Sequence, residues 1–340
     1  MKFKQNKITF LKDNYNEVTG EIYYNVWKSF IAEYEDIRNK DVSEFTPEEI
    51  EGLVINVPSS SANTKNNVLS FINIYCEWAV MRGLININPC SAIDTDKIIK
   101  VNAKRVKSNL YSLEQTYRVC TKLKDNTPIF TWLPLLLARY GIMGANSKEL
   151  INLKWENVDY TNKLIYITDE ETGEITKQVP VDDKLLSYIT MAKGTTSDVI
   201  TYRGSNRMRV NYIDYGYVLK KRDNSLYKGS IQKITKQELY QDMRKAFKTD
   251  KIITLKDLYT SKLIEDLINI REERQLTGSD CYNVAKKYNP DLTRGGYVAV
   301  KREWESLTGE VVVNGNIAPE NLKKGTKEYA DKLRREFFGE

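Results

Sequence analysis

A change of hydrophobic period between residues 164 and 179 constrains the fold more than any other feature of this sequence. Leu164-Ile165-Tyr166-Ile167 and Ile175-Thr176-Lys177-Gln178-Val179 flank Glu171-Thr172-Gly173-Glu174. Glycine permits the tight reversal that joins two antiparallel strands, so this stretch is predicted to be a β-hairpin. Most other apolar patterns in the chain have the three-to-four-residue spacing of helices. The fold is therefore predicted to be mainly α with a small β-hairpin or sheet, an α+β architecture.

The N-terminal part is predicted to be helical. Thr46-Pro47-Glu48-Glu49 has the cap residue, the first-turn proline and the glutamate of a helix start. A helical stripe begins at Lys65 and stops at Gly83, which suits a helix C-terminus. Residues 1–14 are polar and are expected to form a loose arm. One amphipathic helix is predicted from Glu17 to Arg38, because apolar residues recur every four positions at Val18, Ile22, Val26, Phe30 and Tyr34, with Trp27 and Ile31 beside them.

The chain is predicted to consist of two domains joined by a linker. Residues 1–95 are predicted to form a helical domain, residues 96–109 a basic linker, and residues 110–340 a mixed domain that ends in a charged helix. Further helices are expected near residues 114–123, 132–140, 149–155, 182–191, 235–247, 254–274 and 319–338, a strand at 311–313, and a loop-rich or hairpin insertion at 200–230.

Composition narrows the range of functions. The 340 residues are 41% hydrophobic and 29% charged, which suits a soluble protein with a sizeable core. No apolar run approaches the length of a membrane span, and the N-terminus lacks the apolar region of a secretory signal. We therefore expect no membrane association and a cytoplasmic location. The four cysteines form no C-x-x-C pair, so no metal, cofactor or disulfide framework is expected.

Histidine is absent from the chain. This absence excludes every mechanism that needs an imidazole, including the Ser-His-Asp and Cys-His arrangements. It does not exclude all enzymes.

The positive charge is clustered, although the net charge is only +6. Residues 199–248 contain twelve basic and four acidic side chains, and the segment from Lys97 to Lys107 contains five basic and no acidic ones. Such clustering favours a polyanionic partner, while the simpler interpretation is a lysine-rich solvated surface.

The order of these elements resembles that of the tyrosine recombinase, or phage integrase, family. The stretch from Lys65 to Phe71, with Gly83 and Asn88-Pro89, is similar to the end of the family's core-binding domain. LLLARYGIMGANSKELINLKWENVD, residues 135–159, is similar to the opening of its catalytic domain, and the hairpin that ends in Lys177-Gln178-Val179-Pro180-Val181 is similar to the family's hairpin. The resemblance implies a two-domain clamp around duplex DNA.

Family members cut DNA with a tyrosine, while two arginines, a hairpin lysine and two histidine-class residues hold the phosphate. The resemblance places Asn146 at the first arginine, Glu171 at the lysine, Lys256 and Tyr259 at the ends of the H-x-x-R box, and Tyr288 at the second histidine-class position. Tyr297 falls at the nucleophile. A developing phosphate charge needs fixed cationic donors, so we expect no catalytic residues and no cleavage; the interpretation of Tyr297 as an ordinary packed tyrosine stays open.

DNA binding can survive the loss of catalysis, because it depends on phosphate contacts and on helices in the grooves. Double-stranded DNA is the expected partner, through Lys65, Asn66 and Asn67 on one helix, Lys104, Arg105 and Lys107 in the linker, and Lys148, Arg203, Arg207, Arg209, Lys220, Lys221, Arg222 and Lys256 on the second domain.

Within the family, the degenerate motifs and the Tyr-, Asn- and Lys-rich composition resemble the master repressors of SPbeta-type Bacillus phages. The resemblance implies a sequence-specific repressor that binds operator DNA and maintains lysogeny, in the cytoplasm of a bacterial host cell and at its nucleoid. The alternatives are a recombinase with relocated catalytic residues and a structural partner of an active recombinase. A phage or host regulatory protein is a further expected partner. The chain is expected to be a monomer or to self-associate weakly through the C-terminal helix, whose apolar side has Leu322, Tyr329, Leu333, Phe337 and Phe338. Docking of that helix within the same chain is an equal alternative.

Overall fold

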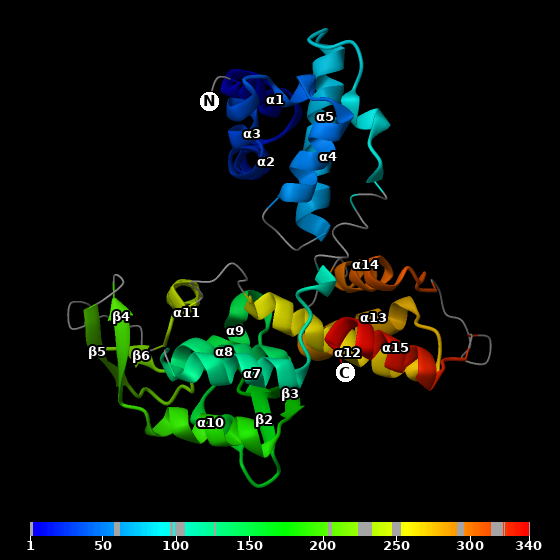
Figure 1. The fold of residues 1–340 in the computed structure, drawn as a ribbon. Helices are drawn as coiled ribbons and strands as arrows, with labels where there is room; N and C mark the ends of the chain where they lie inside the picture. Colours follow the sequence, from blue (N-terminus) through cyan, green and yellow to red (C-terminus); the bar gives the residue numbers. More distant parts are fainter. Residues whose placement is uncertain are drawn as a thin grey trace. The chain divides into compact units, whose positions relative to one another are not determined.

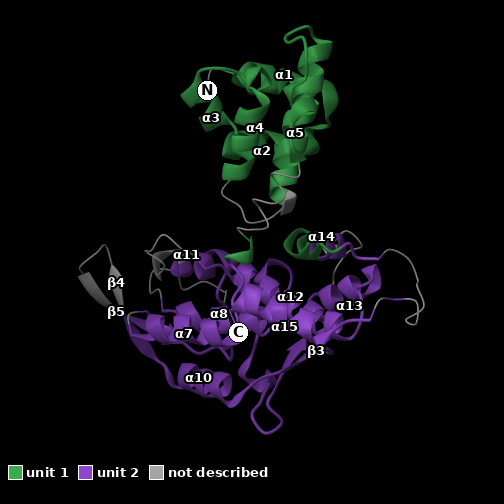
Figure 2. Ribbon diagram, turned by 45° about the vertical axis from the view of Figure 1, so that its right-hand side comes forward, with its two compact units in different colours: residues 1–108, 302–310 green, residues 109–301, 311–340 purple. Residues whose placement is uncertain are grey.

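The computed structural model describes residues 3–57, 62–95, 98, 106–125, 127–202, 206–223, 233–246, 253–290, 296–313, 322 and 324–339. The chain divides into two compact units, residues 1–108 with 302–310 and residues 109–301 with 311–340 (Figure 2). Helices dominate both units, and the strands formed by the described residues all lie in the second (Figure 1). The predicted fold class, mainly helical with small antiparallel sheets, is confirmed.

The described residues of the first unit form helices and connecting loops, and none of them lies in a strand. Its longest helix, α5, ends in a Schellman motif, in which Gly83 adopts φ +69° and the N–H groups of Gly83 and Leu84 reach back to Val80 and Ala79. The capping box predicted at Thr46 is present at the start of α4. The elements of this unit are α1 (Lys4–Asn14), α2 (Glu17–Phe30), α3 (Ala32–Arg38), η1 (Val42–Glu44), α4 (Pro47–Asn56), α5 (Ala62–Met81) and η2 (Pro89–Ala92).

The predicted helix from Glu17 to Arg38 is divided, and its buried side is not the expected one. The chain departs from helical geometry at Ile31, so that α2 and α3 are separate helices. Val18 and Ile22 are 73% and 59% exposed, whereas Trp27 and Ile31 are buried. The prediction was wrong because a regular four-residue repeat drifts around a helix with 3.6 residues per turn, and the bulk of Trp27 determines which side packs inward.

Residues 1–14 were predicted to form a loose arm, but residues Lys4–Asn14 form helix α1. Its sequence is polar, yet Phe10 and the aliphatic part of Lys7 are buried. The Lys7 ammonium donates hydrogen bonds of 2.5 Å to Glu35 Oε1 and 2.6 Å to Asp41 Oδ2, and it lies 4.1 Å from the centre of the Tyr75 ring. A buried lysine is stable only when it is paired, so these contacts explain how a polar segment becomes part of the core.

Helix α8 is the centre of the second unit, and every one of its residues is buried. Helices α7, α10, α11 and α12 all pack against it, and α13 and α15 pack on α12. The helices are α7 (Leu113–Lys124), α8 (Ile129–Arg139), α9 (Lys148–Asn152), α10 (Asp183–Gly194), α11 (Lys236–Ala246), α12 (Leu255–Glu273), α13 (Gly278–Tyr288) and α15 (Lys327–Phe338), with α14 (Gly296–Thr308) divided between the two units and the short turns η3 (Ala145–Ser147) and η4 (Trp155–Asn157).

Two antiparallel three-stranded sheets complete the second unit. In the first, β1 (Val158–Asp159), β2 (Leu164–Thr168) and β3 (Ile175–Pro180) lie in sequence order, with Ile165 opposite Val179. The predicted hairpin is confirmed. The second sheet is formed by β4 (Ser197–Tyr202), β5 (Asn206–Ile213) and β6 (Lys221–Arg222). It lies where a loop-rich or hairpin insertion was predicted, and it has the hairpin structure.

Three C-terminal features differ from expectation. Helices α13 and α14 were not expected. Residues 311–313 form no strand, and Val313 instead makes a single bridge with Thr277. Helix α15 begins at Lys327 with Thr326 as its cap, and its apolar residues Leu333, Phe337 and Phe338 are buried within the chain itself. The Phe338 carbonyl accepts a hydrogen bond of 2.7 Å from Gln115, so the helix docks in cis.

Candidate nucleic-acid interface

The loop between α8 and α9 determines the geometry of the predicted site. Gly141 adopts φ +86°, and a Cβ atom there would lie 2.3 Å from two ring carbons of Tyr288. Gly144 adopts φ +65°, and its missing Cβ would meet the Glu149 side chain at 2.6 Å. Glycine at these two positions lets α13 and α9 approach the backbone closely. The loop therefore packs closely against both Tyr288 and Glu149.

Lys177 is the buried cation at the centre of the site. Its ammonium donates to both oxygens of Glu149, at 2.8 and 2.6 Å, to the Gly141 carbonyl at 2.9 Å and to the Tyr288 carbonyl at 3.1 Å. Burial lowers the pKa of Lys177, and the Glu149 carboxylate partly offsets that effect. Because its donors are all directed at protein atoms, Lys177 joins β3, the loop and α13, and no N–H group remains for an external phosphate.

A second charged network lies behind Tyr288. The Tyr288 hydroxyl donates a 2.7 Å hydrogen bond to Asp266, which also pairs with Lys262 and Lys287. Burial raises the pKa of Tyr288, and the Asp266 charge raises it further. The ring is buried, so Tyr288 is a packing residue between α12 and α13.

Arg139 belongs to the same network. Its guanidinium makes a two-pronged pair with Glu265, at 3.2 and 2.8 Å, and donates to the Tyr111 carbonyl at 2.9 Å. Burial would raise the pKa of Glu265, but the hydrogen bonds from Arg139 and Lys262 leave it lowered. Arg139 is almost fully buried, so its charge interacts with groups inside the unit.

Asn146, which stands at the first arginine position of the resemblance, is exposed and has an unusual backbone. Its φ is +55°, and that of the next residue, Ser147, is +63°. The Asn146 amide oxygen accepts a 2.9 Å hydrogen bond from Lys236 of α11. Lys148, predicted to contact DNA, is also exposed. The loop, the start of α9 and the start of α11 thus present one amide and two lysines.

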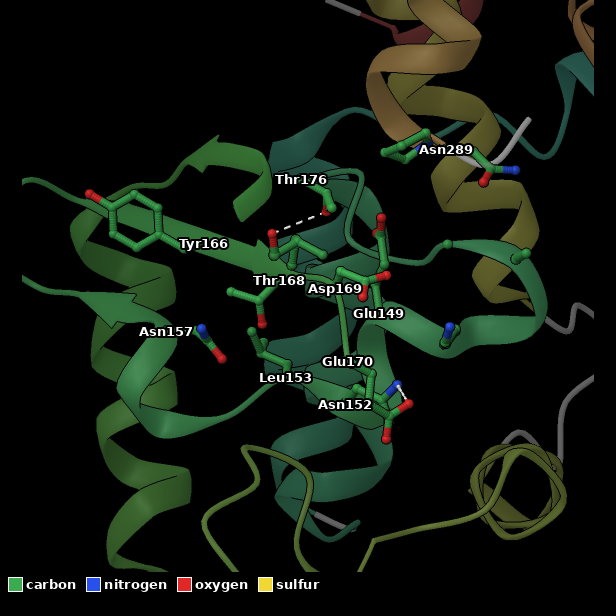
Figure 3. A pocket seen from close by; sticks show the side chains of 15 residues that line it. Glu149, Asn152, Leu153, Asn157, Tyr166, Thr168, Asp169, Glu170, Thr176 and Asn289 are labelled. Carbon is green, nitrogen blue, oxygen red and sulfur yellow. Dashed lines mark hydrogen bonds between the residues drawn. The ribbon is translucent and has the colours of Figure 1, made fainter. Parts of the chain in front are cut away.

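An acidic pocket adjoins this loop. The pocket has a volume of about 60 Å³ and lies between the loop, α9 and the β2–β3 hairpin (Figure 3). Glu149, Asp169 and Glu170 lie together on one side of it, with Asn152 hydrogen-bonded to Glu170. The N–H groups of Thr172 and Glu171 lower the pKa of Asp169, and a hydrogen bond from Lys233 lowers that of Glu170. Asp169 and Glu170 are therefore ionised near neutral pH.

Glu171, at the hairpin-lysine position, is exposed in the turn after β2, where its N–H donates to Asp169. Lys256, in the first turn of α12, is exposed as well. Tyr259, one turn later, is half-buried and packs edge-on against Tyr288. Burial raises the pKa of Tyr259, and the Glu149 charge adds to that effect. Apart from Lys256, these positions supply no cation.

Tyr297, at the predicted nucleophile position, lies in the first turn of α14. It is half-buried, and its ring packs edge-on against Tyr282 of α13 with the ring centres 5.8 Å apart. This contact is compatible with the interpretation of Tyr297 as a packed tyrosine.

The predicted DNA-binding helix of the first unit needs one correction. Lys65 is only 1% exposed, and its ammonium donates a 2.7 Å hydrogen bond to the Ile55 carbonyl near the end of α4. Its four-carbon side chain is long enough to reach that carbonyl, so Lys65 holds α5 against α4 and is not a surface contact. Asn66 and Asn67, its neighbours on α5, are exposed.

Lys220, predicted on the DNA-binding face of the second unit, is also an interior residue. It is 4% exposed and donates to the carbonyls of Lys193 and Thr195 at 2.7 and 3.1 Å. These carbonyls lie at the end of α10, where a lysine satisfies groups that the helix leaves unpaired.

The other basic residues of this predicted set are placed as follows. Arg222 pairs with Asp242 at 2.8 Å. Arg209 is exposed and donates to Ser197 across the β4–β5 hairpin. Lys107 and Lys221 are half-buried, Arg207 lies on β5, and Lys104, Arg105 and Arg203 lie outside the described residues.

Sequence reasoning missed Lys177 and Lys236 as members of the site. Lys177 was missed because the strand pattern of β3 predicts which side chains point to the same face of the sheet. It does not predict that a charged side chain is buried there. Lys236 lies ninety residues from Asn146, so only the packing of α11 on α8 brings the two together.

A cluster of metal ligands and a membrane-spanning helix are both absent from the described part of the chain. Its cysteine and carboxylate side chains form no group of three or more that could hold a metal ion. None of its helices combines the length and the apolarity needed to cross a bilayer.

The fold is mainly helical with small antiparallel sheets, as the resemblance to tyrosine recombinases and phage integrases implies. The chain belongs to the MrpR family. The sequence model of the MrpR N-terminal core-binding domain matches residues 2–81, and that of the MrpR C-terminal catalytic domain matches residues 134–305. MrpR is the repressor family of SPbeta-type phages, so the predicted resemblance is confirmed.

Solved structures similar to this chain are integrases and recombinases. The Tn1549 transposon integrase, in complex with circular intermediate DNA, is 13% identical over 87% of this chain and 97% of its own, with a TM-score of 0.37. The XerA recombinase is 11% identical over 88% and 92%, with a TM-score of 0.32. A lambda integrase dimer bound to a COC' core site is 11% identical over 77% and 87%, with a TM-score of 0.33. No curated protein sequence matches the chain.

Proposed function

We propose that this protein is a sequence-specific double-stranded-DNA-binding transcriptional repressor of a temperate phage or prophage, and that it holds DNA without cutting it. Membership of the MrpR family supports the repressor role. The observation that carries the proposal is the charge of the site. Where a recombinase concentrates cations on one phosphate, this chain has Asn146, Glu171 and Tyr259, and its buried Lys177 is occupied by Glu149.

The expected loss of reaction rate argues against DNA cleavage. Removing one fixed donor to a developing oxyanion typically costs about 10²–10³ in rate. In this chain both arginine positions lack a guanidinium, and the lysine position has the opposite charge. Losses within one catalytic group are not additive, yet even one or two such losses would make strand cleavage too slow to support recombination.

DNA binding has different requirements, and the described residues are consistent with them. Asn66 and Asn67 are exposed in the first half of α5, and asparagine can make paired hydrogen bonds to adenine in the major groove. Lys148 and Lys256 are exposed on the second unit and can contact phosphates regardless of sequence. Sequence recognition is therefore assigned to the first unit and general affinity to the second.

The experiment is genome-wide footprinting of the full-length protein in a lysogen, followed by a reporter assay at the protected sites. The proposal predicts a small set of protected operators whose promoters become active when the protein is removed. Asn67→Ala should lose protection at these operators while it keeps its affinity for unrelated duplexes. Lys154→Gln, in an exposed lysine that pairs with Glu156, is the matched control and should change neither. Protection without any effect on transcription would contradict the repressor role.

A further inference from the structure

The strained turn at Asn146 and Ser147 is fixed from two sides. Left-handed backbone is unfavourable at residues other than glycine, so its presence at two successive residues requires compensation. Ser147 is buried, and its hydroxyl lies 3.3 Å from the hydroxyl of Tyr240. Glu149, two residues later, is held by Lys177 and by the N–H of Met143. The turn is consequently rigid, and Asn146 is its exposed residue.

Helix α11 supplies both contacts to this turn. Tyr240 reaches Ser147, and Lys236, one helical turn earlier on the same side of α11, reaches the Asn146 amide oxygen at 2.9 Å. Since the amide oxygen accepts from Lys236, the amide N–H₂ remains a donor. The Lys236 ammonium has three N–H groups, and Asn146 engages one of them.

We propose that Asn146, Lys236 and Lys148 form a binding site for a single backbone phosphodiester of duplex DNA. The amide and the Lys236 ammonium would donate to the non-bridging oxygens, and Lys148 would add a second positive charge. This inference rests on the proposed function, and it identifies the residue that replaces the missing arginine: a lysine from α11 that approaches from another part of the sequence.

The charges nearby determine where the phosphate lies. Lys148 contributes to the lowered pKa values of both Asp169 and Glu170, so all three groups interact electrostatically. These carboxylates line the adjacent pocket and would repel a phosphate from the hairpin side. The approach that remains lies over Asn146, on the side of α11. The site can bind a phosphate there, but it cannot surround one with fixed cations.

The test is the salt dependence of binding to a fluorescein-labelled duplex of mixed sequence, which measures phosphate contacts directly. Loss of one phosphate contact reduces the slope of log K against log salt by about 0.9. Lys236→Gln should show this reduction and should weaken binding about tenfold at low salt. Lys163→Gln is the matched control, because Lys163 is exposed on the same unit but pairs with Asp183, and it should leave the slope unchanged.

A double-variant cycle distinguishes a shared site from independent contacts. If Asn146 and Lys236 hold the same phosphate, Asn146→Ala should have much less effect in the Lys236→Gln background than in the native protein. The inference is overturned if Lys236→Gln keeps the native slope while the native protein binds the duplex. Failure of the native protein to bind any duplex would instead refute the proposed function.

Discussion

Each unit has a network of carboxylates and cations, but the ratio of acids to cations differs between the two networks. In the first unit, Lys7 is the single cation between Glu35 and Asp41, and all three side chains are nearly inaccessible. In the second unit, two carboxylates of α12, Glu265 and Asp266, are surrounded by three cations: Arg139, Lys262 and Lys287.

The difference appears in the ionisation of the acids. Burial raises the pKa of Glu35, and Lys7 offsets that effect only in part. Burial acts in the same direction on Asp266, but Lys262 and Lys287 more than compensate, and its pKa is lowered. The number of cations per carboxylate therefore determines whether a buried acid favours or resists protonation in the folded state.

The largest expected effect is the loss of a central lysine. Lys7→Met leaves two buried carboxylates without a cation, whereas Lys177→Met leaves only Glu149. Breaking a buried pair costs about 3–5 kcal/mol, and we expect Lys7→Met to lie at the upper end and Lys177→Met at the lower. Hydrogen exchange of the full-length protein, resolved by region, measures each loss in its own unit. Glu149→Gln should rescue Lys177→Met, and a larger cost for Lys177→Met would refute the comparison.

Next in size is a pair of glycine substitutions, one in each unit. Gly83 has open space around its missing Cβ, so Gly83→Ala should cost only the left-handed backbone penalty, about 1–2 kcal/mol. Gly141→Ala must also displace the Tyr288 ring, which adds about 1–3 kcal/mol. Urea unfolding of both variants tests the difference. Equal losses would mean that Tyr288 moves away without cost.

A smaller effect, opposite in sign between the units, is expected on acidification. The lowered pKa values of Glu265 and Asp266 contribute stability that is present above the unfolded value and is lost as the pH falls through the folded one. For Glu35, with a raised pKa, the contribution is complete below the unfolded value and is lost as the pH rises through the folded one. Between pH 6 and pH 4, exchange protection corrected for intrinsic rates should therefore fall around α12 more than around α3. A parallel fall in both units would contradict the comparison.

The smallest predicted effect concerns DNA. Glu171→Lys replaces an exposed acid by a cation at the hairpin turn and should strengthen binding to any duplex a few-fold at low salt, with a steeper salt dependence. Glu174→Lys, in the same turn, should act in the same direction if the hairpin faces DNA. Unchanged affinity for both variants would place the hairpin away from the duplex.

The sequence predicts those elements whose signals are local. The capping box at Thr46, the glycine stop at Gly83 and the β2–β3 hairpin each depend on a few adjacent residues. Helix α1 was not predicted, because its packing relies on Lys7. The pattern of hydrophobic and polar residues assigns a lysine to the surface. Lys65 and Lys220 were wrongly placed on the DNA-binding surface for the same physical reason: a long side chain can reach a buried carbonyl that the sequence does not reveal.

The most direct test combines binding and cleavage in one sample. The protein is incubated with a footprinted operator duplex that has a nick next to each phosphate in turn, so that any tyrosyl attack is trapped as a covalent adduct. The account predicts a stable complex in native gels and no adduct after denaturation. A phosphotyrosyl bond to Tyr297, or to any other tyrosine, would contradict it.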